Sequence, residues 1–95
     1  MKTKPKAKHL RNADPNRYFM LSDGRIVKNL LELADVMDDL TEEVFNHHVN
    51  GTKNDFAAWV KDTFGDEVLA EKLKSNSSKH DHQIHILRHI IRGFL

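Results

Sequence analysis

The residues with the clearest potential for chemistry in this sequence are histidines near its C-terminal end. His85 and His89 are four positions apart and His82 lies about one helical turn before them, so a helix would carry all three imidazoles on one face. Imidazoles at this spacing can chelate a transition metal, and Asp81 would add a carboxylate ligand. These four residues are therefore a candidate site for a divalent transition metal.

The sequence around these histidines also contains features that oppose a metal site. Arg88 and Arg92 flank the imidazoles, and their positive charges would repel a bound cation. The chain has no cysteine, and no further ligand in the same helix completes the four that a structural zinc site requires. Binding of a Zn, Ni, Cu or Fe ion, or of an iron-mineral surface, is therefore an alternative hypothesis for this face, beside a plain solvated polar surface.

A second pair of histidines, His47 and His48, precedes a loop rich in hydrogen-bonding groups. If Phe45 faces the core, helical spacing places His48 near the core and turns His47 away from it. We interpret His48 as a histidine at the edge of the core with a backbone partner, and Asn50 and Asp55 as caps. A small chain without cysteine or a Gly-rich phosphate loop offers few ways to build a catalytic site, so we expect no enzyme.

A helix must position the histidines near the C-terminus, and residues 80–95 have the pattern of one. Its apolar residues cover about half of the circumference, opposite the histidines. These residues are Ile84, Ile86, Leu87, Ile90, Ile91, Phe94 and Leu95. Such an arc can dock on the domain's own core, form a dimer interface or lie in a membrane interface. Because a small domain needs apolar area for its core, we expect docking on the domain or on a second copy.

The segment before this helix begins with the pattern of a β-hairpin, over residues 18–27. Asp23-Gly24 is a favoured two-residue turn, because its residues tolerate positive φ, and apolar residues flank it on both sides. A two-residue loop would pair Leu21 with Ile26, and Met20 with Val27. An isolated hairpin is marginal in water, so we expect one of its faces to pack on the helices that follow.

Helical segments follow the hairpin, and each begins at a polar side chain that can accept a hydrogen bond from a free backbone N–H. The expected N-caps are Asn29, Thr41, Thr52 or Asn54, and Asp66. The third helix carries a clean apolar stripe formed by Phe56, Trp59, Val60, Thr63 and Phe64. Gly65 is expected to end it. The fold class is therefore mainly α: a small helical domain of about five helices with an N-terminal β-hairpin.

The chain divides into a disordered basic arm (1–14), a core of hairpin and helices (15–74), a polar linker (75–79) and the His-rich amphipathic C-terminal helix (80–95). The arm is rich in lysine and the body is rich in acids, although the net charge is only +1. A basic tail on an acidic body argues against general nucleic-acid binding. Without a secretory signal, or the roughly 20 apolar residues that cross a bilayer, the protein is expected to be cytoplasmic.

Several segments of the chain, in their order and spacing, match a known pattern. They are Leu21-Ser-Asp-Gly-Arg-Ile-Val-Lys28, Leu30-Leu-Glu-Leu-Ala34, His47-His-Val-Asn50 and Asn54-Asp-Phe-Ala-Ala-Trp-Val-Lys-Asp-Thr-Phe-Gly-Asp66. With them, roughly residues 19–73 resemble an uncharacterised prokaryotic domain family, with many members in archaea. The resemblance implies a shared fold and supplies no activity or ligand. The basic arm and the last helix lie outside it.

These observations together favour a small non-catalytic interaction or oligomerisation module that uses its amphipathic C-terminal helix. The partner would be a second copy or another protein, and the interface would consist of Ile84, Leu87, Ile90, Ile91, Phe94 and Leu95. One alternative is a metal-binding module that uses Asp81, His82, His85 and His89. A second alternative is peripheral binding of the same helix to a membrane surface.

Overall fold

The hairpin consists of β1 (Phe19–Met20) and β2 (Ile26–Val27), which pair antiparallel. The observed pairs are Phe19 with Val27 and Met20 with Ile26, so the predicted pairing is wrong by one residue. The loop is longer than predicted, because the Leu21 N–H donates to the Arg25 carbonyl (2.8 Å) and the Gly24 N–H to the Leu21 carbonyl (2.9 Å). Gly24 supplies the positive φ, +96°, that this loop requires.

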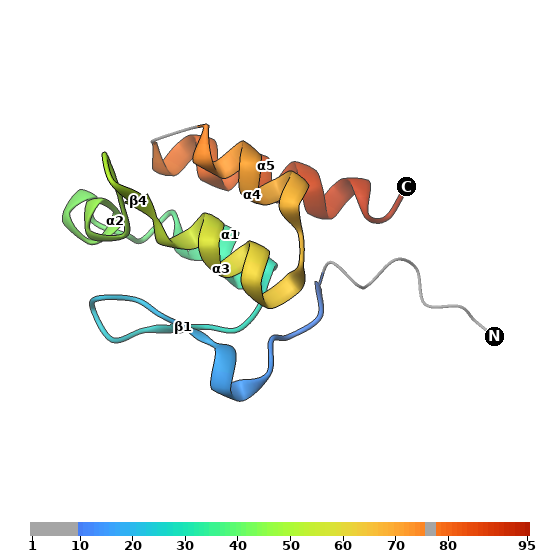
Figure 1. Cartoon of the computed structure of the whole chain (residues 1–95), viewed down its shortest axis with the longest axis horizontal. Coiled ribbons are helices and arrows are strands. Elements are labelled where there is room, and N and C mark those ends of the chain that lie inside the picture. Colours follow the sequence, from blue (N-terminus) through green and yellow to red (C-terminus); the bar gives the residue numbers. More distant parts are fainter. Residues whose placement is uncertain (1–9, 76–77) are drawn as a thin grey trace.

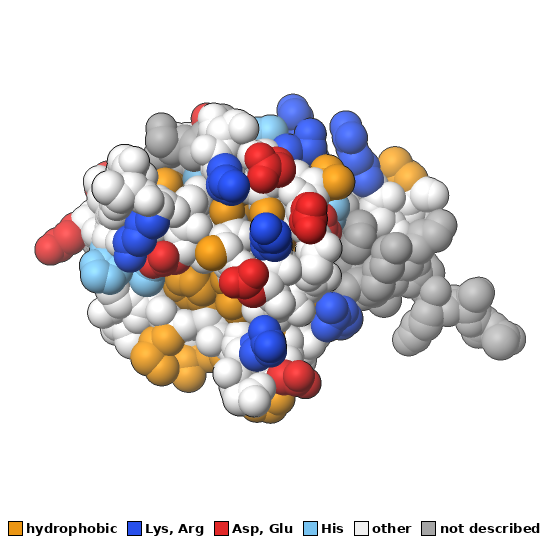
Figure 2. Space-filling model, viewed as in Figure 1, with side chains coloured by type: hydrophobic (Ala, Val, Ile, Leu, Met, Phe, Trp, Pro, Cys, Tyr) orange, Lys and Arg blue, Asp and Glu red, His pale blue; other side chains and the backbone are white. Residues whose placement is uncertain are grey.

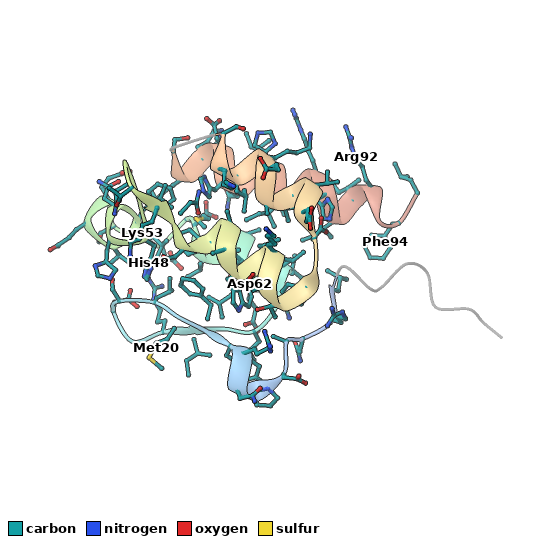
Figure 3. All side chains as sticks on the ribbon, in the orientation of Figure 1. Met20, His48, Lys53, Asp62, Arg92 and Phe94 are labelled. Carbon is teal, nitrogen blue, oxygen red and sulfur yellow. The ribbon has the colours of Figure 1, made fainter. Side chains whose placement is uncertain are left out.

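The shifted pairing decides which apolar side chains of the hairpin are buried. Phe19, Leu21 and Val27 face the core, whereas Met20 and Ile26 are exposed on the other side. Figure 3 shows Met20 pointing away from the helices. A slip of one residue moves every side chain of a strand to the opposite face, so the loop geometry sets this choice.

The first two helices begin at the expected caps. α1 (Leu30–Val36) starts at Asn29, whose side chain accepts from the Glu32 N–H at 2.8 Å. The Glu32 carboxylate in turn accepts from the Lys28 N–H at 2.8 Å. In a standard capping box it would accept from the N–H of the N-cap, which here is Asn29, one residue later. α2 (Glu42–His48) starts at Thr41, whose hydroxyl accepts from the Val44 N–H at 3.1 Å.

A short second hairpin, which the sequence did not suggest, joins α2 to α3. It consists of β3 (Val49–Asn50) and β4 (Lys53–Asn54), with Val49 opposite Asn54 and Asn50 opposite Lys53. α3 (Asp55–Phe64) begins at Asn54, one of the two predicted caps, and ends at Gly65, which has a φ of +68°. α4 (Glu67–Lys74) begins at the predicted cap Asp66. α5 (Lys79–Arg92) begins after the cap Ser78.

The computed structural model describes residues 10–75 and 78–95, and within them the helices surround a single core. α5 packs against α1 and α4, and α3 packs against α4; the hairpin lies along the lower side in Figure 1. The largest fully buried side chains are Leu21, Val27, Leu33, Leu40, Phe45, Phe56, Val60, Leu69, Leu73, His82 and Ile86. The expected mainly α fold with five helices and an N-terminal hairpin is confirmed. No helix in the described ranges is long and apolar enough to span a membrane.

The N-terminal segment enters the fold before the predicted core. Residues 1–9 of the predicted basic arm lie outside the described residues. After them, Leu10 packs against the core, Ala13 is buried, and the Ala13 N–H donates to the Lys28 carbonyl at 2.8 Å. Of the predicted linker 75–79, residues 76 and 77 also lie outside the described part of the chain.

Candidate functional site

α5 docks on the domain through a narrow stripe of side chains. His82, Ile86 and Ile90 are buried, and they recur at a spacing of four residues on the face that meets α1 and α4. The Gln83 side chain donates to the Ala34 carbonyl at 2.9 Å, which ties the start of α5 to α1. Ile90 is thus the one residue of the predicted interface set that is buried within the domain.

The rest of the predicted apolar arc does not dock on the domain. Ile84 is half-buried, and Leu87, Ile91, Phe94 and Leu95 are exposed. The face of α5 that contacts the core is the boundary between the apolar arc and the histidine row. The centre of the apolar arc does not contact the core. On this face the core provides a polar partner for one of the histidines from a distant part of the chain.

His82 is that histidine, and it is fully buried, where the sequence suggested a solvent-exposed face. Its Nδ1 lies 2.9 Å from the Ser78 carbonyl, and its Nε2 lies 3.0 Å from the Asn54 side-chain nitrogen. A carbonyl can only accept and the amide nitrogen can only donate, so Nδ1 carries the proton and the imidazole is neutral. Burial lowers the pKa of His82, and the hydrogen bond to Ser78 offsets part of that effect.

Asn54 connects three helices through its side chain. Its oxygen accepts from the Ala57 N–H at 2.9 Å and thereby caps α3. Its nitrogen donates to the Leu73 carbonyl of α4 at 3.1 Å and to His82 of α5 at 3.0 Å. These partners fix the orientation of the amide, which therefore presents an N–H and not an oxygen to His82.

The lowered pKa of His82 makes the stability of the fold depend on pH. The unfolded chain binds a proton at this imidazole below about pH 6.5, whereas the folded chain resists it. We therefore expect the free energy of unfolding to be greatest above about pH 6.5 and to fall, by up to about 1.4 kcal/mol per pH unit, as the pH decreases below that value. Urea unfolding between about pH 7.5 and 5 measures this slope.

The variant His82→Leu is the control for this pH dependence, because it removes the imidazole and leaves every other histidine in place. We expect the variant to lose the part of the slope that His82 causes. An NMR titration of the His82 imidazole in the unmodified protein tests the same point without a variant. A His82 that protonates in the folded state at the ordinary pH of a histidine would contradict the buried, neutral assignment.

The other predicted metal ligands are less buried than His82. The His89 side chain hydrogen-bonds through Nε2 to Asp66, the N-cap of α4. His85 and Asp81 are partly exposed. Within the described part of the chain, no group of three or more His, Asp or Glu side chains is arranged to hold a metal ion. The structure therefore does not bring the predicted ligands His82, His85, His89 and Asp81 together as one set.

A groove runs between α4 and α5, and two of the four predicted metal ligands, His85 and His89, line it. Its cavity volume is about 270 Å³, and it is lined by Val68, Lys72, His85, Arg88, His89 and Arg92. In Figure 2, Lys and Arg side chains gather at the upper right, over α4 and α5, with histidine and hydrophobic atoms beside them. Sequence reasoning missed Val68 and Lys72, because they come from a different helix and their partners are distant in the chain.

The exposed apolar residues at the end of α5 form a second surface, which we call the apolar end: Leu87, Ile91, Phe94 and Leu95. The backbone continues in a helical turn beyond Arg92, since the Phe94 N–H donates to the Ile91 carbonyl (3.0 Å) and the Leu95 N–H to the Arg92 carbonyl (3.1 Å). This turn keeps Phe94 and Leu95 near the helical surface. In Figure 3, Arg92 and Phe94 point in opposite directions from the helix.

His48, the candidate in the second histidine pair, is held by protein groups at both ring nitrogens. It is buried while His47 is exposed, as the sequence predicts. The Ser22 backbone N–H donates to His48 Nε2 at 3.0 Å, and Nδ1 lies 2.9 Å from the Asp55 carboxylate. Burial raises the pKa of Asp55, but hydrogen bonds from His48 and Lys53 outweigh it and leave the pKa lowered. The predicted cap role of Asp55 is wrong, because Asn54 caps α3.

Comparisons with known proteins identify a family but no activity. A family model described as "Family of unknown function (DUF5752)" matches residues 14–94. This match includes α5, which the resemblance noted in the sequence left out. No curated protein and no solved structure matches the chain.

Proposed function

This chain belongs to a family of unknown function, DUF5752, and we propose that it is a non-catalytic interaction module that self-associates through the apolar end of α5. The observation that carries this proposal is the exposure of that surface. The exposed fractions are 58% for Ile91, 41% for Phe94 and 85% for Leu95, while a different face of the same helix is already buried in the core. The domain's own core therefore does not cover these side chains.

The energetics of apolar exposure support an interface there. Exposed apolar surface has an unfavourable hydration free energy of about 25 cal/mol per Å², and association removes it from water. Leu87, Ile91 and Phe94 recur at helical spacing, so two copies of the helix can pack the same rows against each other. A twofold dimer uses one patch twice and is the commonest soluble oligomer. These considerations favour a second copy as the partner.

The charges on α5 leave the apolar end accessible. Arg88 and Arg92 line the groove toward α4. Arg92 points away from the helix on the other side from Phe94 (Figure 3). Two copies that meet through the apolar end thus keep these guanidinium groups away from the centre of the interface. This arrangement matches the apolar centre and charged rim of protein interfaces.

The buried histidines support the non-catalytic part of the proposal. Both ring nitrogens of His48 and of His82 already lie within hydrogen-bond distance of protein groups. An imidazole acts as a general base only when one nitrogen can reach a proton of the substrate. Both histidines instead act as links between elements of the fold.

Light scattering after size-exclusion chromatography tests self-association of the full chain. We expect a dimer that dissociates on dilution. We expect Ile91→Glu to raise the dissociation constant of this dimer at least about tenfold, because it places a charge in the interface. The melting temperature of the monomer should hardly change, because the side chain is exposed.

The matched control is Met20→Glu, which places the same charge on an equally exposed hydrophobic position of the hairpin. We expect this variant to dimerise like the unmodified protein. A chain that stays monomeric at high concentration, or a dimer that Met20→Glu disrupts as strongly as Ile91→Glu, would rule out self-association through the apolar end.

A further inference from the structure

The groove between α4 and α5 concentrates positive charge. Lys72 comes from α4, and Arg88 and Arg92 come from successive turns of α5. His85 and His89 lie on the same side of α5, at the spacing of one turn, and complete the polar lining. No carboxylate lines this groove within the described part of the chain.

The acidic side chains of α4 do not line this groove, and Asp66 before it contacts the lining residue His89. Glu67 and Glu71 of α4 line a separate cavity on the α3 side, and Glu71 also pairs with Lys74 at 3.3 Å. Asp66, at the start of α4, is hydrogen-bonded to His89. Within the described residues, neither Arg88 nor Arg92 forms an ion pair with an acidic side chain. α4 thus presents Glu67, Glu71 and Lys74 toward α3, and Lys72 toward α5.

From this juxtaposition we propose that the groove binds a phosphate monoester of a small soluble molecule. Guanidinium groups on two helical turns can donate N–H bonds in fixed directions, and Lys72 adds a point charge from the facing helix. A phosphate monoester carries about −1.5 to −2 charges and three acceptor oxygens, so it can use donors from several sides at once. A carboxylate has fewer acceptors and a single charge.

The shape of the groove determines the size of the ligand. Ligand sites typically enclose about 300–1,000 Å³, and the volume here is about 270 Å³. A phosphate with a short organic part fits this space. Val68 gives the groove an apolar wall that can contact such a part. The same cations oppose a metal ion, which agrees with the absence of a metal-binding cluster within the described residues.

The test is an NMR titration of the full chain with sn-glycerol 3-phosphate, and with inorganic phosphate as the minimal anion. Glycerol serves as the neutral comparison at the same concentrations. We expect saturable shifts of backbone amides in residues 85–92 and around residue 72 with both phosphates, and none with glycerol. Separate arms use vesicles of phosphatidylglycerol or phosphatidylcholine and a single-stranded oligonucleotide, since each polymer or membrane also presents phosphate.

The paired variants are Arg88→Gln with Arg92→Gln, and, as a control with the same loss of charge, Arg25→Gln with Lys61→Gln. Arg25 lies in the hairpin loop, and Lys61 lies on α3 beside the separate cavity between α3 and α4, so neither lines the groove. We expect the first pair to weaken glycerol phosphate binding at least about tenfold and the control pair to change it less than about twofold. Circular dichroism verifies that both double variants keep their helices.

The proposal is overturned by any of several results. Shifts that do not saturate, or an equal loss in both double variants, would mean general charge attraction and not a site. Shifts confined to residues outside the groove would place the anion elsewhere. Binding to phosphatidylglycerol vesicles or to the oligonucleotide without binding to glycerol phosphate would assign the cations to a membrane or a nucleic acid.

Discussion

Replacing Ile86 with alanine should lower the free energy of unfolding by about 2–5 kcal/mol, the range for large-to-small substitutions in a core. Ile86 lies on the face of α5 that packs against the rest of the domain, and its exposed fraction is 0%. The substitution removes apolar contacts and leaves a cavity that the surrounding helices fill only in part. Urea unfolding followed by circular dichroism measures the change.

The neighbouring substitution Leu87→Ala is the matched control for Ile86→Ala. Leu87 has an exposed fraction of 38%, so its truncation should cost about 1 kcal/mol or less in the monomer. Measurements at low protein concentration separate this cost from any contribution of a dimer. The opposite ranking, with Leu87→Ala the more damaging, would mean that α5 docks through the centre of its apolar arc.

Replacing Asn54 with alanine should have the second large effect, about 2–4 kcal/mol. The variant removes the N-cap of α3 and leaves the Leu73 carbonyl and His82 Nε2 without their amide donor. Each such group is partly or fully buried and loses a hydrogen bond that water replaces poorly. Thermal and urea unfolding measure the loss.

The variant Asn54→Asp separates the two roles of this side chain. An aspartate keeps an oxygen for the α3 cap but offers no N–H to His82. A carboxylate beside Nε2 favours a protonated imidazole, so we expect the pKa of His82 to rise relative to the unmodified protein. Asn50→Ala serves as the control, because Asn50 makes its hydrogen bonds at an exposed loop. An Asn54→Ala cost no larger than that of Asn50→Ala would contradict the linking role of Asn54.

The sequence by itself determined the local structure of this protein. The caps Asn29, Thr41 and Asp66 and the helix end at Gly65 were predictable, because each depends on partners within a few residues. The buried stripe of α3 and the burial of His48 were also predictable, since helical spacing decides which residues share a face. A mainly α fold with an N-terminal hairpin follows from these local features.

Other features depend on residues that are far apart in the chain. The hairpin pairing depends on the length of the loop around Gly24, which the Asp23-Gly24 pair alone does not specify. β3 and β4 contain only two residues each, which is too short for an alternating pattern to be visible.

The tertiary structure alone decided how α5 uses its surfaces. Hydropathy placed His82 opposite the apolar arc, but Asn54 and the Ser78 carbonyl satisfy both of its ring nitrogens inside the core. Burying a polar group is tolerable only when its hydrogen bonds are formed, and a helical pattern does not reveal a donor that lies on β4. With His82, Ile86 and Ile90 on the docking face, the apolar end of α5 stays exposed and Arg88 and Arg92 line the groove toward α4.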